Sequence, residues 1–280
     1  MAENTHNRLR QLQGLISIDA WHGESTVTGH VDLRAYVNFD EARLGGQSDD
    51  EVAFRLSLRK AELILRQSEP KSFKFDPAHL WRGDKSISVE RKTLKNAGRK
   101  NIRSRSSDLE ASKSPKLSFS SERSSEDSIS GSVESKAEES SKTINVSFSR
   151  NDPTRPGWIL KPREDAPRVK DAEVLYGQPW DEDEISLAKL IMNKNHASAE
   201  MLSMLSIYVI CRQEDLVFHD IKIKGQNGTW ITMPEASPKR FVIQEYLRKS
   251  LMSEGLPGSD LHNPFAIVHL GEAISEFRKS

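Results

Sequence analysis

The amino-acid sequence predicts an α+β fold: an antiparallel β-rich sandwich or barrel with a disordered insertion, followed by a smaller α+β domain. Three observations carry this prediction. Apolar residues alternate with period two in the first 90 residues, serine and charge dominate from about 95 to 141, and helical spacing begins after Trp180. We therefore divide the 280 residues into a first β-rich part (1–94), the insertion (95–141), a second β-rich part (142–180) and the α+β domain (181–280).

The β-strands are predicted from the alternation itself. Residues 52–58 alternate apolar side chains with Ala53, Arg55 and Ser57, which is typical of a strand with one buried face. Short extended segments are also predicted at 15–18, 27–37, 63–65, 73–75, 87–89, 144–148, 158–160 and 174–176. Because neither the segments before the insertion nor those after it make a complete domain, we expect the two sets to pair in one antiparallel sheet system.

The insertion is predicted from composition. Nine of the twenty residues from 111 to 130 are serine, and such a segment buries too little apolar surface to offset the entropy lost on ordering. Its first part is basic and its second part acidic, so it is interpreted as a solvated linker, a basic arm for an anionic partner, or a phosphorylation target. The candidate nucleic-acid contacts of the arm are Lys95, Arg99, Lys100, Arg103 and Arg105.

The last hundred residues show mixed signals. Apolar residues at helical spacing predict helices over 181–191, 197–212, 238–255 and 263–277, the third beginning at Ser237-Pro238. Between them, residues 216–224 and 229–233 flank the turn sequence Gly-Gln-Asn-Gly at 225–228, which predicts a hairpin.

Composition excludes several classes of protein. Forty-one basic and 41 acidic residues give a formal charge of zero, which argues against electrostatic binding over the whole surface. A single cysteine, Cys211, excludes an internal disulfide framework and a cysteine-rich zinc module, and we expect it to be buried in the core. There is no apolar run of the ~20 residues that a membrane span needs, and the first residues are polar, so we expect a cytoplasmic protein without a membrane partner.

The best metal candidate is a pair of residues on one strand. His30 and Asp32 are two apart, so both side chains fall on one face of the strand, and His79 could complete a set of two histidines and one carboxylate. The sequence identifies no cofactor.

A second candidate site resembles a nuclease pattern. Asp84, or Asp76, followed by Glu90 and Lys92 imitates the carboxylate and lysine arrangement that holds a catalytic divalent ion beside an activated water. The standard phosphate, dinucleotide, nucleophile-elbow and zinc-protease motifs are missing. His219 and Asp220 are adjacent on a predicted strand, so their side chains are expected to point to opposite faces.

Two functional hypotheses follow. The first is an adaptor protein that binds another protein and has no catalytic activity, since the common catalytic motifs are missing and the insertion is charge-segregated. The alternative is a divalent-metal-dependent enzyme or binding protein acting on nucleic acid, with the basic arm as a possible contact. The sequence leaves open whether the protein is an enzyme.

Overall fold

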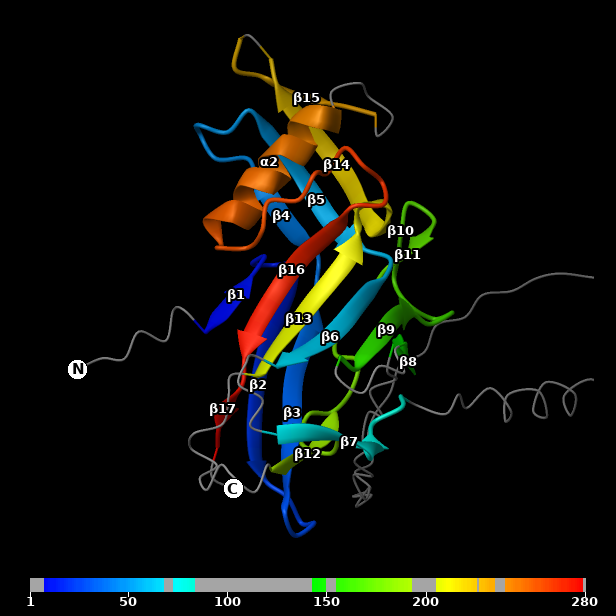
Figure 1. Ribbon diagram of the computed structural model, residues 1–280. Helices are drawn as coiled ribbons and strands as arrows, with labels where there is room; N and C mark the ends of the chain where they lie inside the picture. The colour runs from blue at the N-terminus through cyan, green and yellow to red at the C-terminus, as the bar shows by residue number, and fades with distance from the viewer. Residues whose placement is uncertain are drawn as a thin grey trace, which may run out of the picture. The chain divides into compact units, whose positions relative to one another are not determined.

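The computed structural model describes residues 8–67, 73–83, 143–149, 155–192, 205–225, 227–234 and 240–278. These residues form mainly antiparallel β-sheets, with a 3-10 helix at Gln213–Asp215 and one α-helix, α2 (Arg240–Ser253) (Figure 1). The predicted β-rich α+β class is confirmed. The insertion at 95–141 and the strand predicted at 87–89 lie outside the described residues.

The strands form three larger sheets and one short hairpin. The first sheet has the order β1 (Leu9–Gln11), β16 (Ile267–Ile274), β13 (Leu205–Arg212), β6 (Ala61–Gln67), β9 (Gly157–Pro162), β8 (Ile144–Phe148). The second has the order β17 (Glu276–Phe277), β2 (Ile16–Glu24), β3 (His30–Phe39), β12 (Ala188–Met192), β7 (Phe73–Leu80). The third has the order β15 (Trp230–Thr232), β14 (Leu216–Lys224), β5 (Val52–Leu58), β4 (Ala42–Gly45), and the hairpin joins β10 (Arg168–Val169) to β11 (Ala172–Glu173).

Strands from the two sides of the insertion pair directly. β6 pairs antiparallel with β9, and the indole Nε1 of Trp158 donates a hydrogen bond to the carbonyl of Trp81 at 2.6 Å. Gly83 has a φ of +83°, and a Cβ there would lie 2.1 Å from the carbonyl oxygen of Val146. The chain therefore reaches residue 83 in contact with β8, the strand with which it resumes.

Strands after residue 180 join the same sheets. β12 pairs with β3 and β7, β13 pairs with β6, and β14 pairs with β5. One hydrophobic cluster includes residues from the three larger sheets and from α2. The domain boundaries at residues 94, 141 and 180 stay predictions.

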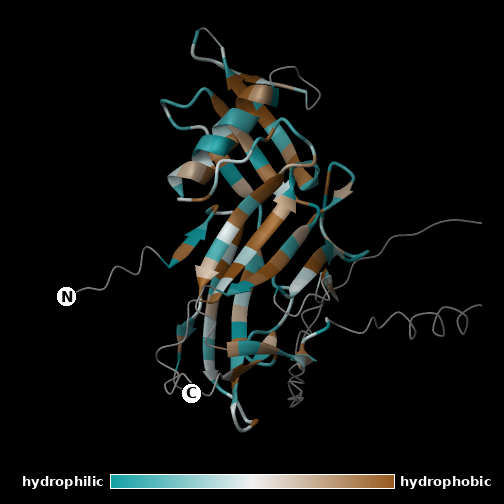
Figure 2. Cartoon of the chain, viewed as in Figure 1, coloured by the Kyte–Doolittle hydropathy of each residue, from teal (hydrophilic) through white to brown (hydrophobic). Residues whose placement is uncertain are grey.

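Helix predictions were right at one place and wrong at three. The helix predicted at 238–255 is α2, and the hairpin predicted around 225–228 is β14 and β15. The described residues of the other three regions contain β12, β13 and β16 instead. β13 is central in its sheet and buried on both faces, so its apolar residues form a nearly continuous run, as Figure 2 shows, and periodicity cannot distinguish such a run from a buried helix.

The third sheet has two different faces. Its inner side packs against α2, where Phe54 of β5 contacts Tyr246 of the helix with ring centroids 6.1 Å apart. Phe54 also contacts Phe218 of β14, and the guanidinium of Arg240 lies over the Phe218 ring. No helix in the described part of the chain, α2 included, is long and apolar enough to span a membrane.

Candidate metal centre

An irregular edge strand positions two of the three residues of the candidate centre. β7 pairs with β12 through Phe73 to Phe75 and again at Leu80, but the register shifts between these points, so residues 76–79 bulge out of the ladder. Pro77 lies in this bulge and has no N–H to give to a ladder, which is why proline is tolerated at sheet edges. The bulge turns Asp76 and His79 toward each other, with Asp76 Oδ2 at 2.7 Å from His79 Nδ1.

The third residue comes from β3. His30 Nε2 lies 3.2 Å from the same oxygen, Asp76 Oδ2. One ligand atom from each of His30, Asp76 and His79 therefore lies within 4.8 Å of the other two, and the described residues hold one such group. We call these three residues the His30 centre. His30 and Asp76 are largely covered, whereas the His79 side chain is 43% exposed, so the centre opens to solvent on the His79 side.

His30 has an acceptor at each ring nitrogen. Its Nδ1 lies 3.2 Å from the carbonyl oxygen of Thr28, and its Nε2 faces Asp76 Oδ2. A neutral imidazole carries one proton, so it can donate to one of these oxygens only. A cation beside Nε2 would let the ring donate its one proton from Nδ1 to Thr28 while Nε2 and Asp76 share the ion. Donation from the far nitrogen to a backbone carbonyl is also how metal-binding histidines are oriented.

Asp76 is held as an anion in a fixed orientation. Its Oδ1 accepts a hydrogen bond from the backbone N–H of Ala78 at 3.0 Å, which leaves Oδ2 for the two imidazoles. The hydrogen bond from His79, followed by that from Ala78, holds the pKa of the Asp76 carboxyl below its usual value. The carboxylate is therefore ionised at neutral pH, as a metal ligand must be.

Asp32, the carboxylate predicted from the sequence, has a different partner. Lys189 of β12 donates to Asp32 Oδ1 at 2.8 Å and to Ser25 Oγ at 2.8 Å. The structure thus brings His30 and His79 together as predicted, but with Asp76 as the carboxylate. Asp76 and His79 are three residues apart in the sequence. In a regular strand their side chains would point to opposite faces, and Pro77 alone did not predict the bulge that brings them together.

The other predicted site residues lie outside the described part of the chain. These are the nuclease-like candidates Asp84, Glu90 and Lys92, and the basic arm residues Lys95, Arg99, Lys100, Arg103 and Arg105. Cys211 is buried as expected, although in a strand, and burial raises the pKa of its thiol well above the ordinary value. A buried thiol of this kind is a poor nucleophile.

A second group of polar side chains lies in the third sheet, and sequence reasoning missed it. The register of β14 shifts between His219 and Lys222, and Asp220 adopts a positive φ of 51°. This irregularity lets His219 and Asp220 approach, with Nδ1 3.9 Å from the carboxylate, contrary to the expectation from strict alternation. The Nε2 of His219 faces Glu41 Oε2 at 3.1 Å and Ser57 Oγ at 3.3 Å.

Arg55 completes this second group, which we call the His219 cluster: His219, Ser57, Glu41, Asp220 and Arg55. Arg55 donates to Glu41 at 2.8 Å and forms an ion pair with Asp220 at 3.2 Å. Both carboxylates are thus already neutralised by a cation. His219 and Ser57 are buried, so a substrate would reach neither without displacing covering atoms.

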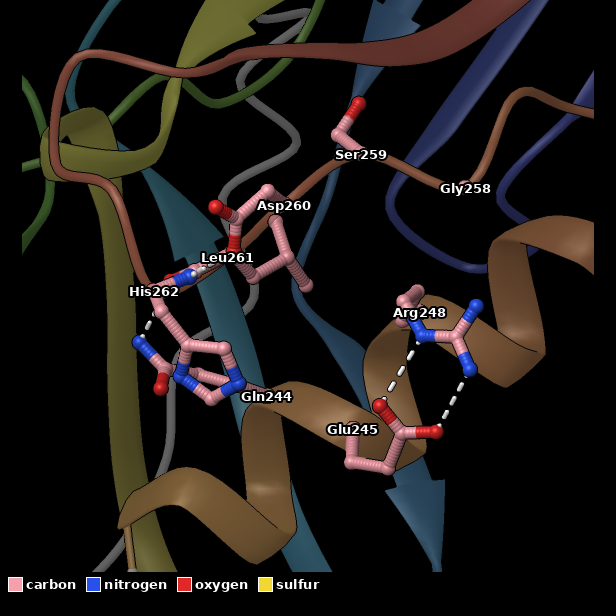
Figure 3. Close-up of a pocket in the computed structure, with 8 residues that line it drawn as sticks. All are labelled: Gln244, Glu245, Arg248, Gly258, Ser259, Asp260, Leu261 and His262. Carbon is pink, nitrogen blue, oxygen red and sulfur yellow. Dashed lines mark hydrogen bonds and ion pairs between the residues drawn. The ribbon is translucent and has the colours of Figure 1, made fainter.

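A hollow lies beside α2. It encloses about 310 Å³ between the helix and residues 258–262 (Figure 3). Its polar groups are satisfied by one another: Gln244 Nε2 donates to the carbonyl of Leu261 at 2.7 Å, and Arg248 makes two hydrogen bonds to Glu245. This hollow therefore offers few free groups to a ligand.

Comparison with known proteins assigns no family to the chain. No protein-family model matches it, and no curated protein matches it at a significant level.

Proposed function

We propose that this protein binds a divalent transition-metal ion, with His30, Asp76 and His79 as the protein ligands. The observation that carries the proposal is the convergence of His30 Nε2 and His79 Nδ1 on one carboxylate oxygen, within 4.8 Å. The fixed orientation of each ligand group supports it, since His30 contacts Thr28 and Asp76 accepts from Ala78.

The ligand set suggests which ions fit. Two imidazoles and one carboxylate suit Zn²⁺, Fe²⁺, Co²⁺ or Ni²⁺ and disfavour Ca²⁺ and Mg²⁺, which prefer oxygen ligands. Three protein ligands leave at least one coordination position for water or a substrate, and the exposed side of His79 is where that position would open. The alternative hypothesis from the sequence also proposes a divalent metal, but with Asp84, Glu90 and Lys92, which lie outside the described residues.

The test is a titration of the metal-stripped full chain with Zn²⁺ and with Co²⁺. We expect one ion per chain by calorimetry, and a visible Co²⁺ spectrum that reports nitrogen and oxygen ligands. Asp76→Asn and His79→Ala should each weaken Zn²⁺ binding by at least about tenfold, which corresponds to about 1.4 kcal/mol. His262→Ala is the matched control, because His262 is an exposed histidine on the loop after α2.

Two results would contradict the proposal. Stoichiometric binding that survives both substitutions would place the metal elsewhere. Absence of Zn²⁺ and Co²⁺ binding at micromolar concentration would indicate that the centre is a hydrogen-bonded network of the three side chains and holds no metal.

An adaptor role without catalysis remains a second proposal, and one observation favours it. Phe265 and Phe241 are 68% and 58% exposed, and the Phe241 ring stacks on His262, with centroids 6.3 Å apart, three residues before Phe265. Exposed aromatic side chains are frequent anchors in protein interfaces. The single buried cysteine supports a cytoplasmic site for such a partner.

The adaptor proposal is tested by affinity capture with nuclease-treated lysate. A protein recovered with the full chain should be lost with Phe241→Ser and Phe265→Ser and retained with Tyr176→Ser, which changes another exposed aromatic residue. Equal recovery with all three variants would refute an interface at this place.

A further inference from the structure

We propose that the side of the third sheet turned away from α2 binds single-stranded nucleic acid. The argument rests on which side chains that side carries, on their charge and on the small residues between them. It is independent of the His30 centre: in Figure 1, β14 and β15 lie at the upper end and β7 and β12 at the lower end of the described part.

The alternation of β5 defines this surface. Phe54 packs against α2, so its neighbours Ala53 and Arg55 point to the opposite side of the sheet. Register then assigns the adjoining strands, because directly paired residues share a face. The pairs are Arg43 with Arg55, Gly45 with Ala53, Ala53 with Lys222, Lys222 with Thr232, and Lys224 with Trp230. We call this set of residues the open face.

The open face is hollowed. A cavity of about 490 Å³ is lined by Arg43, Gly45, Ala53, Arg55, Lys222 and the acidic Asp220, among others. Its floor consists of the small residues Gly45 and Ala53, so a planar or phosphate-bearing group can approach the backbone of the sheet. Larger cationic side chains stand on both sides of this floor.

Some of the cationic side chains of the open face have partners among the described residues, and others do not. Arg55 is held by Glu41 and Asp220, and the ammonium of Lys224 donates to the carbonyl of Ser48. Arg43 and Lys222 are exposed and make no ion pair or hydrogen bond with any residue in the described ranges. Two free cations beside a shallow hollow are complementary to an anionic chain.

Trp230 distinguishes nucleic acid from other anions. It lies on the edge strand β15, on the same side as Lys222 and Thr232, and is 39% exposed. A base can stack on such an indole while its phosphates contact lysine and arginine, which is how sheet surfaces bind single strands. Stacking on Trp230 needs a base that is unpaired and exposed, so we infer a single strand.

The experiment measures binding of a fluorescent 20-nucleotide oligo(dT) to the full chain by anisotropy, with chelator present, over a range of salt concentrations. We expect affinity to fall linearly with salt on logarithmic axes. Lys222→Gln and Arg43→Gln should each weaken binding severalfold and reduce the salt slope by about 0.7, the value for one phosphate contact on a single strand. Trp230→Ala should weaken binding about fivefold or more.

The matched control is Lys249→Gln. Lys249 is exposed on α2, on the other side of the same sheet, so its loss changes the net charge equally without touching the open face. A second background replaces Lys95, Arg99, Lys100, Arg103 and Arg105 by glutamine in the full chain. The open-face substitutions should weaken binding in both backgrounds. Circular dichroism of each variant checks that it is folded.

Three outcomes would overturn the proposal. The first is equal weakening by Lys249→Gln, which would mean binding to net charge. The second is binding that depends on the basic arm and not on the open face. The third is displacement of the oligonucleotide by a polyglutamate of equal charge together with unchanged binding by Trp230→Ala, which would identify an acidic-peptide surface. Failure in any of these ways leaves the Zn²⁺ titration unaffected.

Discussion

The His30 centre and the His219 cluster both place histidine beside carboxylate, but the geometry of the contacts differs. In the His30 centre, two imidazoles approach one oxygen of Asp76. In the His219 cluster, Glu41 lies at Nε2 and Asp220 at Nδ1, on opposite edges of one ring. Ligand atoms that converge can share an ion, whereas atoms on opposite sides of an imidazole cannot.

The two groups also differ in whether a neighbouring cation pairs with their carboxylates. Arg55 lies between the two carboxylates of the His219 cluster and pairs with both. On β12, next to the strand that carries His30, Lys189 pairs with Asp32, whereas Asp76 contacts the two histidines. Under the proposed metal function, the direction of the side-chain nitrogen and oxygen atoms and the placement of the neighbouring cation distinguish the two groups more than their residue types do.

The largest expected effect is stabilisation by metal. Zn²⁺ at 100 times its dissociation constant should raise the free energy of unfolding by about 2.7 kcal/mol if it binds only the folded chain. His79→Ala, with binding at least about tenfold weaker, should remove at least about half of this gain, and Arg55→Met should remove none of it. Urea denaturation with and without Zn²⁺ measures it. A gain that depends on Arg55 would reverse the roles assigned to the two groups.

Replacement of His219, which is buried in the third sheet, should have the next largest effect on stability. His219→Leu leaves the Ser57 hydroxyl, itself buried, without the imidazole partner, which costs about 1–3 kcal/mol for an unsatisfied buried polar group. His79→Leu in the absence of metal should change stability by less than about 0.5 kcal/mol, since His79 is exposed. Denaturation of both metal-free variants compares them. Similar losses would mean that the His30 centre is also structural.

Arg55→Met tests whether the His219 cluster lacks a metal because of the orientation of its carboxylates or because of the Arg55 charge. We expect a loss of stability of about 1 kcal/mol or less, because the Arg55 side chain is 38% exposed and its ion pairs are partly solvated. We also expect no additional Zn²⁺ to bind, because Glu41 and Asp220 still face different nitrogens. Calorimetric stoichiometry gives the answer. A second Zn²⁺ in this variant would show that the cation alone prevents metal binding there.

His22 extends the comparison to a histidine without a carboxylate contact, with the smallest expected effect. Its Nδ1 meets Ser275 Oγ at 3.1 Å, and its Nε2 is buried without a partner among the described residues. Burial lowers the pKa of His22, with partial opposition from Glu276. The unfolded chain therefore binds a proton at this residue more readily than the folded one, so His22 should reduce stability as pH falls below about 6.5.

The measurement is the free energy of unfolding at pH 7.5 and pH 5.5 for the wild-type protein and His22→Asn, both with chelator. The variant should lose less stability on acidification than the wild type. An identical loss in the two proteins would assign the acid sensitivity to other groups.

The sequence predicted the sheets better than it predicted the site. Strands such as β5 and β8 follow from alternation because one of their faces is less buried than the other. β13 was taken for a helix because burial on both faces removes the alternation. His30 and His79 could be singled out by residue type, but Asp76 became the carboxylate only through a bulge and through the pairing of Lys189 with Asp32. Both depend on β12, more than a hundred residues away in the sequence.

The contact between Gly83 and Val146 has a consequence for how this gene can change. Gly83 and β8, the described parts of the chain before and after residues 84–142, lie in contact, so the paired strands do not depend on the number of residues between them. Doubling the length of such a closed loop costs only about 0.6 kcal/mol in chain entropy. The position is therefore one where insertions and deletions can accumulate, or a reporter be placed, while the paired strands on either side keep their registration.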